Sequence, residues 1–268
     1  MALMIIPVMI CGIGFTSCEP KMDEEVDDDI IITIDPNYPT TIHRLSEETL
    51  LQMRSHYAQR NPFVRCTIDQ FGFCSCTIEN EGVIDAPLGS LTREEAIATV
   101  KEFVACNPDN TGISNPDDLD FDQIGTSTHQ NIVYWNFWAK QKKINNIELY
   151  GTGIVFHIIN KAVYLCWGNH FPNVYVPEKF NFDIERAKSK LLGKEVIHLG
   201  WAGEYSFGKI KKEHLRESAT NLIVVPLKTE EKIELRVAWK IYLASLYYIF
   251  YVDVMTGEII QEEPTIFA

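Results

Sequence analysis

The pattern of apolar and polar positions between residues 133 and 173 predicts a series of antiparallel strands. Every second residue from Val133 to Ala139 is apolar or aromatic, which is the period of a strand whose two faces differ. Polar residues at 141–146 interrupt the pattern, and a second strand is predicted over 147–159. Asn160-Lys161 then suits a tight hairpin turn into a third strand at 162–167. The region is therefore a predicted β-meander.

Two segments with N-terminal capping residues predict helices. Thr92 and Glu95 form a capping box in front of an apolar stripe, and this helix should end at Asn107-Pro108. Asp183 opens a second helix with the same spacing from cap to alanine, and Gly193 suits its C-terminus. Both helices precede segments that read as strands.

The order of these segments predicts the fold class. Strands at 133–167 follow the first helix, and strands at 222–227, 233–243 and 247–260 follow the second. A helix laid on an antiparallel meander, occurring twice, predicts an α+β fold. We expect two consecutive units of this kind, at residues 91–176 and 177–268.

The segment from 30 to 90 matches no pattern that assigns it to a type. It contains a predicted short strand at 30–34 and a predicted helix at 45–59 capped by Ser46. The helix should turn Leu50, Leu51 and Met53 toward a core. Residues 63–84 are rich in cysteine and aromatic residues, and predict a hairpin that turns near 70–72.

The residues of the meander resemble a known family. Trp138 to Gln141, Ile147 to Gly151, Gly168-Asn169 and Pro172-Asn173 follow one another as in the propeptides of thermolysin-like and fungalysin-like metallopeptidases, with Glu148 where that family favours proline. The segment from Leu235 to Ile260 resembles the end of a PepSY module. The resemblance implies cystatin-like units. It also implies a relationship to propeptides that help a catalytic domain to fold and inhibit it until cleavage.

The N-terminus resembles a bacterial lipoprotein signal. The apolar run from Met1 to Phe15 is short for a membrane span and is followed by Thr16-Ser17-Cys18, although no Lys or Arg precedes it. We expect residues 1–17 to be a signal peptide, Cys18 to be lipidated, and residues 18–29 to be an acidic tether. Acidic residues behind the cysteine resemble the surface-export signal of Bacteroidetes-type lipoproteins. This implies a lipid-anchored protein of the cell envelope, at the outer membrane, on its periplasmic or surface face.

The charge and the cysteine content restrict the classes of partner and the disulfides that we expect. The 268-residue chain carries a formal net charge of −13, which argues against nucleic acid, since nucleic acid rewards basic surfaces. Five cysteines lie after Cys18, an odd number that leaves at least one free thiol. We expect structural thiols, or one local disulfide from Cys66 to Cys74 or Cys76. The pairing among these three and two more, Cys106 and Cys166, stays open.

Candidate chemistry is sparse. The sequence has no H-E-x-x-H zinc motif and no G-x-S-x-G nucleophile motif. Four residues fall at the ligand positions of a calcium loop, which we weigh against a solvated acidic connection: Asn107, Asp109, Thr111 and Asp118. Asp253 and Gly257 are expected to shape a turn. Trp201 and Tyr205, on an expected loop, are the candidates for an exposed ligand-binding patch.

These observations predict a protein without catalytic activity and without a cofactor. The first hypothesis is an envelope protein that binds, and inhibits or chaperones, a peptidase or another envelope protein. A metallopeptidase is the partner that the resemblance implies. The alternative is a surface lipoprotein that binds a glycan or another ligand near Trp201.

Overall fold

Strands supply most of the secondary structure in the computed structural model, which describes residues 34–64, 66–76, 90–121, 123–129, 132–200 and 203–265. The fold is mixed helix and sheet, as expected. The predicted signal peptide, Cys18, the tether, almost all of the strand at 30–34, the end of the hairpin at 77–84 and Trp201 lie outside the described residues. No helix among the described residues is long and apolar enough to cross a membrane.

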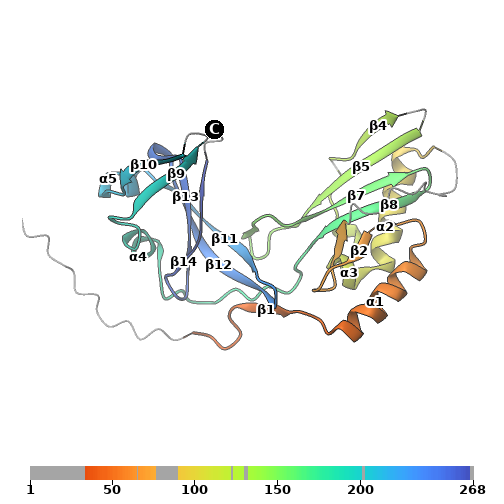
Figure 1. Cartoon of the computed structure of the whole chain (residues 1–268), viewed down its shortest axis with the longest axis horizontal. Helices are drawn as coiled ribbons and strands as arrows, with labels where there is room; N and C mark the ends of the chain where they lie inside the picture. Colours follow the sequence, from red (N-terminus) through yellow and green to blue (C-terminus); the bar gives the residue numbers. More distant parts are fainter. Residues whose placement is uncertain are drawn as a thin grey trace, which may run out of the picture. The chain divides into compact units, whose positions relative to one another are not determined.

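The first sheet contains the predicted meander, together with a strand at its edge, Gly125–His129, that the sequence pattern did not predict. Its strands are β4 (Gly125–His129), β5 (Ile132–Lys140), β7 (Gly153–Ile159) and β8 (Ala162–Asn169), paired antiparallel in the order β4-β5-β7-β8 (Figure 1). The turn between β7 and β8 contains Asn160 at a φ of 53°, which confirms the hairpin turn expected there.

Helix α2 (Arg93–Cys106) covers one face of this sheet. The predicted capping box is confirmed, because Glu95 N–H donates to Thr92 Oγ1 at 3.2 Å and Thr92 N–H donates to a Glu95 carboxylate oxygen at 2.8 Å. Phe103 of the helix packs edge-on against Phe156, and Phe156 stacks on Phe137. Short turns at α3 (Pro108–Thr111) and the 3-10 helix η1 (Pro116–Asp118) lead from the helix to β4.

The segment before α2 belongs to the same core. Helix α1 (Glu47–Arg60) starts at its predicted cap, Ser46, and the hairpin of β2 (Cys66–Ile68) and β3 (Cys74–Cys76) lies beside β8. Leu50 is buried, but Leu51 is 71% exposed, so its predicted core position is wrong. Successive helical residues differ by about 100°, and the buried face that contains Leu50 and Tyr57 turns Leu51 to solvent.

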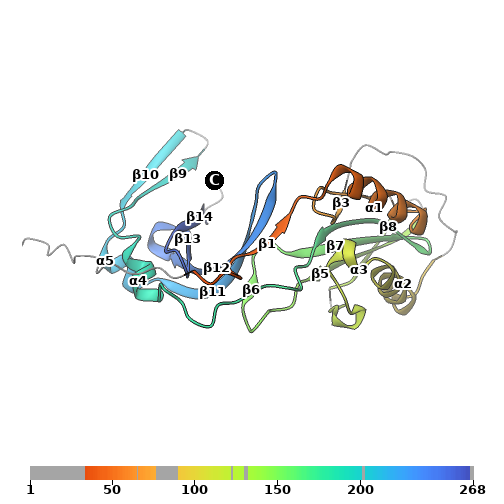
Figure 2. The same ribbon diagram turned by 90° about the horizontal axis from the view of Figure 1, so that it is seen from below.

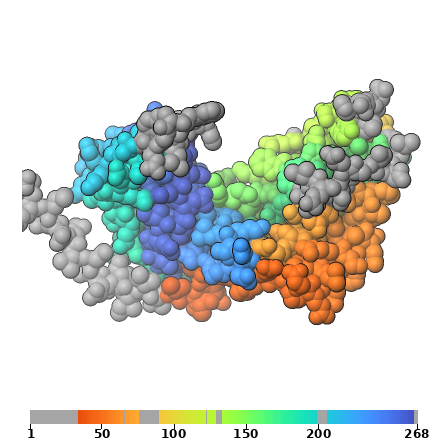
Figure 3. Space-filling model, viewed as in Figure 1, coloured from red at the N-terminus to blue at the C-terminus, as the bar shows by residue number. Residues whose placement is uncertain are grey.

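The second sheet contains the other long meander. Its main path is β14 (Ile259–Pro264), β13 (Tyr248–Asp253), β12 (Lys232–Leu243), β11 (Ala219–Lys228) and β6 (Glu148–Leu149). Strand β1 (Thr40–His43) pairs antiparallel with the first residues of β12. Figure 3 shows the orange-red segment that includes β1 lying against the blue strands of this sheet.

Several short elements lie between the two meanders. Helix α4 (Ile184–Ser189) is capped by Asp183, as predicted, but ends four residues before Gly193. It is followed by the hairpin of β9 (Glu195–Gly200) and β10 (Gly203–Lys209), then by α5 (Lys212–Arg216) (Figure 2). The 3-10 helix η2 (Ala244–Leu246) joins β12 to β13. The expected loop around Tyr205 is wrong, because Tyr205 belongs to β10.

The predicted strand at 147–159 is two strands in different sheets. Strand β6 pairs with β11 in parallel, whereas β7 pairs with β5 and β8. The chain turns between them at Gly151, whose φ is 63°, and Gly153 has a φ of 155°, a conformation that glycine adopts more readily than other residues. One continuous strand was therefore the wrong interpretation, and the second sheet includes a parallel pair.

Candidate functional site

The face of the first sheet opposite α2 carries an unusual number of aromatic side chains. Trp138, Val155 and Trp167 lie directly opposite one another on β5, β7 and β8. Side chains alternate between faces along a strand, so this row points away from the core that holds Phe137 and Phe156. Together with three further residues it forms what we call the aromatic face: Tyr134, Trp138, Val155, His157, Tyr164 and Trp167.

The rings of the aromatic face contact one another. The His157 ring stacks on Trp167 with centroids 4.9 Å apart, and Tyr164 packs edge-on against both His157 and Tyr134. A β-bulge lies beside these rings, because the register between β7 and β8 shifts between His157, which faces Leu165, and Ile158, which faces Val163. Trp138 is 51% exposed, and the others are partly buried.

The centre of this surface is uncharged near neutral pH. Burial lowers the pKa of His157 below its ordinary value, because desolvation disfavours the imidazolium form. Lys140, at the end of β5, is ion-paired with Glu148 at 3.4 Å. A group of partly exposed rings with a charged residue, Lys140, at its margin suits contact with another molecule, since exposed apolar patches are uncommon on surfaces that face only water.

The neighbouring edge of the sheet is accessible. In the part of the chain that the structure describes, β4 pairs with β5 alone, so its other side presents main-chain N–H and C=O groups. Gly125 to Thr128 are exposed and uncharged. Natural edge strands usually carry charges or proline that discourage a further strand, and β4 has neither.

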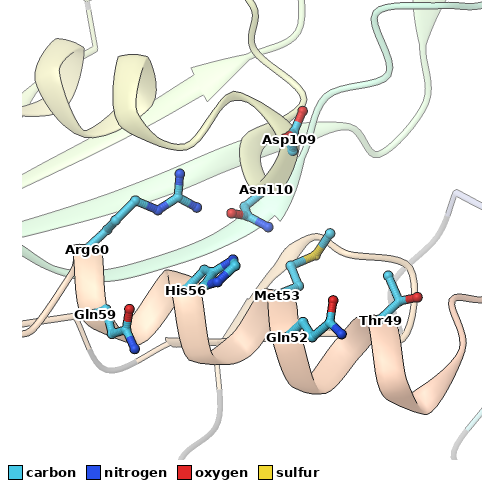
Figure 4. A pocket seen from close by; sticks show the side chains of 8 residues that line it. All are labelled: Thr49, Gln52, Met53, His56, Gln59, Arg60, Asp109 and Asn110. Carbon is cyan, nitrogen blue, oxygen red and sulfur yellow. The ribbon is translucent and has the colours of Figure 1, made fainter.

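Apart from the aromatic face, a groove lies between α1 and α3 (Figure 4). This groove has a volume of about 500 Å³ and eight lining residues: Thr49, Gln52, Met53, His56, Gln59, Arg60, Asp109 and Asn110. The six residues of α1 recur at intervals that place them on one side of the helix. Asn110 is buried and donates its amide to Gly72 O at 3.0 Å, and its side-chain oxygen has no hydrogen-bond partner among the described residues. The exposed guanidinium of Arg60 supplies donors to the groove, whereas the Asn110 oxygen is buried in its wall.

Paired asparagines fix the end of this groove. Asn61 and Asn107 are the C-caps of α1 and α2, and each donates its amide to the side-chain oxygen of the other, at 2.9 and 3.1 Å. Each amide also donates to a carbonyl of its own helix. Two helix ends are thus held together, which sets Arg60 against Cys106 O at 2.7 Å.

The structure separates the four calcium candidates into two places. Asn107 uses its side chain in the asparagine pair, and Thr111 donates its hydroxyl to Asn107 O. Asp109 is exposed at the groove, whereas Asp118 lies on η1 and pairs with Lys142 at 3.2 Å. Within the described ranges, no group of three or more His, Cys, Asp or Glu side chains is arranged to hold a metal ion.

The structure also tests the predicted turn at Asp253 and Gly257 and the predicted disulfide. Asp253 accepts the N–H groups of Met255 and Thr256 at 2.8 and 2.9 Å, and Gly257 has a φ of 69°, so the expected turn is confirmed. The expected local disulfide from Cys66 to Cys74 or Cys76 is not formed, since Cys66 is a free thiol. Tyr205 lies on β10, and its side chain lies outside the part of the chain that the structure describes.

Sequence reasoning missed the aromatic face, although a signal was present. Tyr134 and Trp138 occupy the alternate positions of β5 that a solvated strand face fills with polar residues. Two large aromatic residues at those positions, followed by His157 and Trp167 on the next strands, indicate a surface that is not simply solvated.

Comparisons with known proteins do not identify a family for this chain. No family model matches the chain, and no curated protein matches it. Among solved structures, the C-terminal domain of Bacillus megaterium YpeB is similar at 11% identity and a TM-score of 0.30, over 82% of this chain and 98% of that domain. A TM-score of this size is too low to assign a fold or a function.

Proposed function

We propose that this chain is a non-catalytic binding protein that holds a polypeptide partner on its aromatic face. The observation that carries the proposal is the row of Trp138, Val155 and Trp167 across three strands, with Trp138 51% exposed. Tryptophan and tyrosine supply large contact areas at protein interfaces, and exposed indoles are frequent binding hot spots.

The free edge of β4 favours a polypeptide over other ligands. An extended segment can add to a sheet edge through main-chain hydrogen bonds while its side chains contact the adjoining face. Strand β4 offers five residues without charge or proline, next to Tyr134 of β5. A glycan can stack on aromatic rings but cannot continue a β-ladder.

The biological setting belongs to the same proposal. The lipoprotein-like N-terminus supports attachment at Cys18 to the cell envelope, and the propeptide resemblance supports a peptidase, or another envelope protein, as the partner. In this view the chain inhibits or chaperones its partner and turns over no substrate. The groove between α1 and α3 is a second contact point, where the exposed guanidinium of Arg60 suits a main-chain carbonyl.

Peptide display on the purified full chain tests the proposal. Peptides should be selected, and the dissociation constants of the best binders measured by fluorescence anisotropy for the parent chain and for Trp138→Ala. We expect the substitution to weaken binding about 10- to 30-fold, because loss of a hot-spot side chain costs roughly 1.4–2 kcal/mol. Hydrogen exchange of the β4 amides should slow on binding.

Leu51→Ala is the matched control, because Leu51 is also a large exposed apolar residue but lies on α1. It should leave the dissociation constant within about twofold. Failure to select any peptide that depends on Trp138 would contradict the proposal. Binding on a glycan array that is lost in Trp138→Ala, without peptide binding, would assign the same face to the alternative function.

A further inference from the structure

Three thiols from three strands meet inside the first core. They belong to Cys66 on β2, Cys74 on β3 and Cys166 on β8, and all three contribute to one hydrophobic cluster. The Sγ of Cys66 accepts the main-chain N–H of Cys166 at 2.7 Å, although 100 positions separate the two residues in the sequence. The Cys74 thiol donates to the hydroxyl of Tyr57 at 3.6 Å.

The cluster is asymmetric. Cys66 is partly exposed, whereas Cys166 is completely buried. The hydrogen bond from the Cys166 thiol lowers the pKa of Cys66, with further lowering from the Cys166 main chain and from Tyr57. Burial raises the pKa of Cys166. Cys66 is therefore the thiol that reagents reach and that ionises first, and Cys166 is the buried neighbour.

We propose that Cys66 and Cys166 are a redox pair that forms a disulfide by exchange with a low-molecular-weight disulfide. The Cys66 thiolate attacks one sulfur of the donor, so that a mixed disulfide forms and one donor thiolate leaves. The Cys166 sulfur then attacks the Cys66 sulfur, the bond between Cys66 and the donor breaks, and the Cys166 proton passes to the leaving thiolate, which departs as the second donor thiol. Two protein thiols and one donor disulfide thus become one protein disulfide and two donor thiols.

The hairpin register argues against the shorter pairing with Cys74. Cys66 lies opposite Cys76 and Ile68 lies opposite Cys74, so Cys66 and Cys74 are diagonal neighbours. Diagonal positions place Cβ atoms about 7 Å apart, whereas a disulfide needs about 3.5–4.5 Å. Cys76 is the competitor that remains, since directly opposite residues in an antiparallel pair are closer.

The consequence of the bond is a covalent link between the hairpin and the sheet. Strands β2 and β3 contact β8, and α1 lies over the hairpin. Joining Cys66 to Cys166 closes a loop of about 100 residues that includes α2 and three strands of the first sheet. Long closed loops restrict the unfolded chain strongly, so the oxidised protein should be more resistant to unfolding.

The test uses the full chain with Cys11, Cys18 and Cys106 replaced by serine, because Cys106 is exposed and would react independently. After incubation with oxidised glutathione, proteolysis without reductant and mass spectrometry should recover the Cys66 and Cys166 peptides as one linked species, two hydrogens lighter than their sum. The melting temperature should rise by about 5–15 °C and return on reduction.

Single substitutions distinguish the two steps of the exchange reaction. Cys166→Ser should stop the reaction at the mixed disulfide on Cys66, and Cys66→Ser should abolish both steps, whereas Cys74→Ser should leave the link intact. A link from Cys66 to Cys76, or from Cys166 to Cys74, would overturn the assignment. So would a folded parent chain in which Cys66 and Cys166 both remain free thiols after prolonged oxidation.

Discussion

The two sheets differ in how many of their faces are covered. All six residues of β13 in the second sheet are buried, so both of its faces lie against other side chains. Along β7 of the first sheet, buried and partly exposed residues alternate up to Ile158, so only one face has a core. Both sheets contain a four-stranded antiparallel meander, and the difference lies in what covers the strands.

The covering of the second sheet comes from distant parts of the chain. Tyr248 and Phe250 pack against Leu191 and Val196, from the segment around α4 and β9. On the opposite face, Tyr251 packs beside Tyr150, which follows β6, and both hydroxyls donate to Glu263 at 2.6 Å. Among the described residues, no segment covers Trp138 of the first sheet in this way, and its side chain is 51% exposed. Burial in the second sheet serves stability, whereas the aromatic face of the first sheet keeps part of its aromatic area exposed.

Equivalent truncations on the two sheets should give the largest contrast. Tyr251→Ala removes a fully buried ring and should lower the free energy of unfolding by about 3–5 kcal/mol. Trp138→Ala removes a half-exposed ring and should lower it by less than about 1 kcal/mol. Urea denaturation followed by circular dichroism measures both. Equal losses for the two variants would show that the aromatic face is a structural core rather than a binding surface.

The helix caps and turns of the two sheets could be predicted from the sequence, whereas the segments that pack over each sheet could not. The capping box at Thr92, the hairpin turn at Asn160 and the turn at Asp253 depend on neighbouring residues, so the sequence alone identified them. The pairing of β6 with β11 joins residues about 75 positions apart, and no local pattern encodes it. Helix α4 passes into i→i−3 turns at Leu191 and Leu192 before the hairpin of β9 and β10, whose sequence has no strong strand period.

The aromatic face likewise combines a part that the sequence predicts with a part that depends on distant packing. The strands that carry Trp138 and Trp167 were predicted, but whether a sheet face is covered depends on which distant segment packs there. The thiol cluster likewise needs β8 beside the β2–β3 hairpin. Sequence spacing could only suggest a pairing within the hairpin, such as Cys66 with Cys74.

The attachment of β1 to the second sheet should give an intermediate effect. The Tyr38 hydroxyl donates to Asp253 Oδ2 at 2.8 Å and accepts the N–H of Val237 at 3.0 Å, all within the interior. Tyr38→Phe leaves the fully buried Asp253 with one donor fewer, and should lower the free energy of unfolding by about 1–3 kcal/mol. Hydrogen exchange should accelerate in β1.

Tyr175→Phe is the control for this change, because Tyr175 also donates to an aspartate, Asp35, but in a solvated setting. It should have a much smaller effect on the urea midpoint. If Tyr38→Phe left both the midpoint and the exchange of β1 unchanged, the cover that β1 gives to the second sheet would not depend on this contact.

The smallest expected effect concerns the pH dependence of the first sheet. His170 follows β8, is 9% exposed, and its Nε2 hydrogen bonds to Ala139 O at 3.0 Å; a carbonyl can only accept, so Nε2 carries the hydrogen. Burial lowers the pKa of His170, while the bond to Ala139 O opposes this. The hollow beside it is also lined by Asp118, Lys142 and Lys143.

The sign of this effect follows from proton binding. The unfolded chain, with an ordinary histidine pKa of about 6.5, binds a proton at a higher pH than the folded chain does. The contribution of His170 should therefore be absent above pH 7.5 and should lower the free energy of unfolding as the pH falls through 6.5, by up to about 1.4 kcal/mol per unit of pH. His170→Gln should flatten this slope between pH 7 and pH 5.5, whereas Trp138→Ala should retain it. An unchanged slope in His170→Gln would show that the imidazole accepts a proton within the folded sheet.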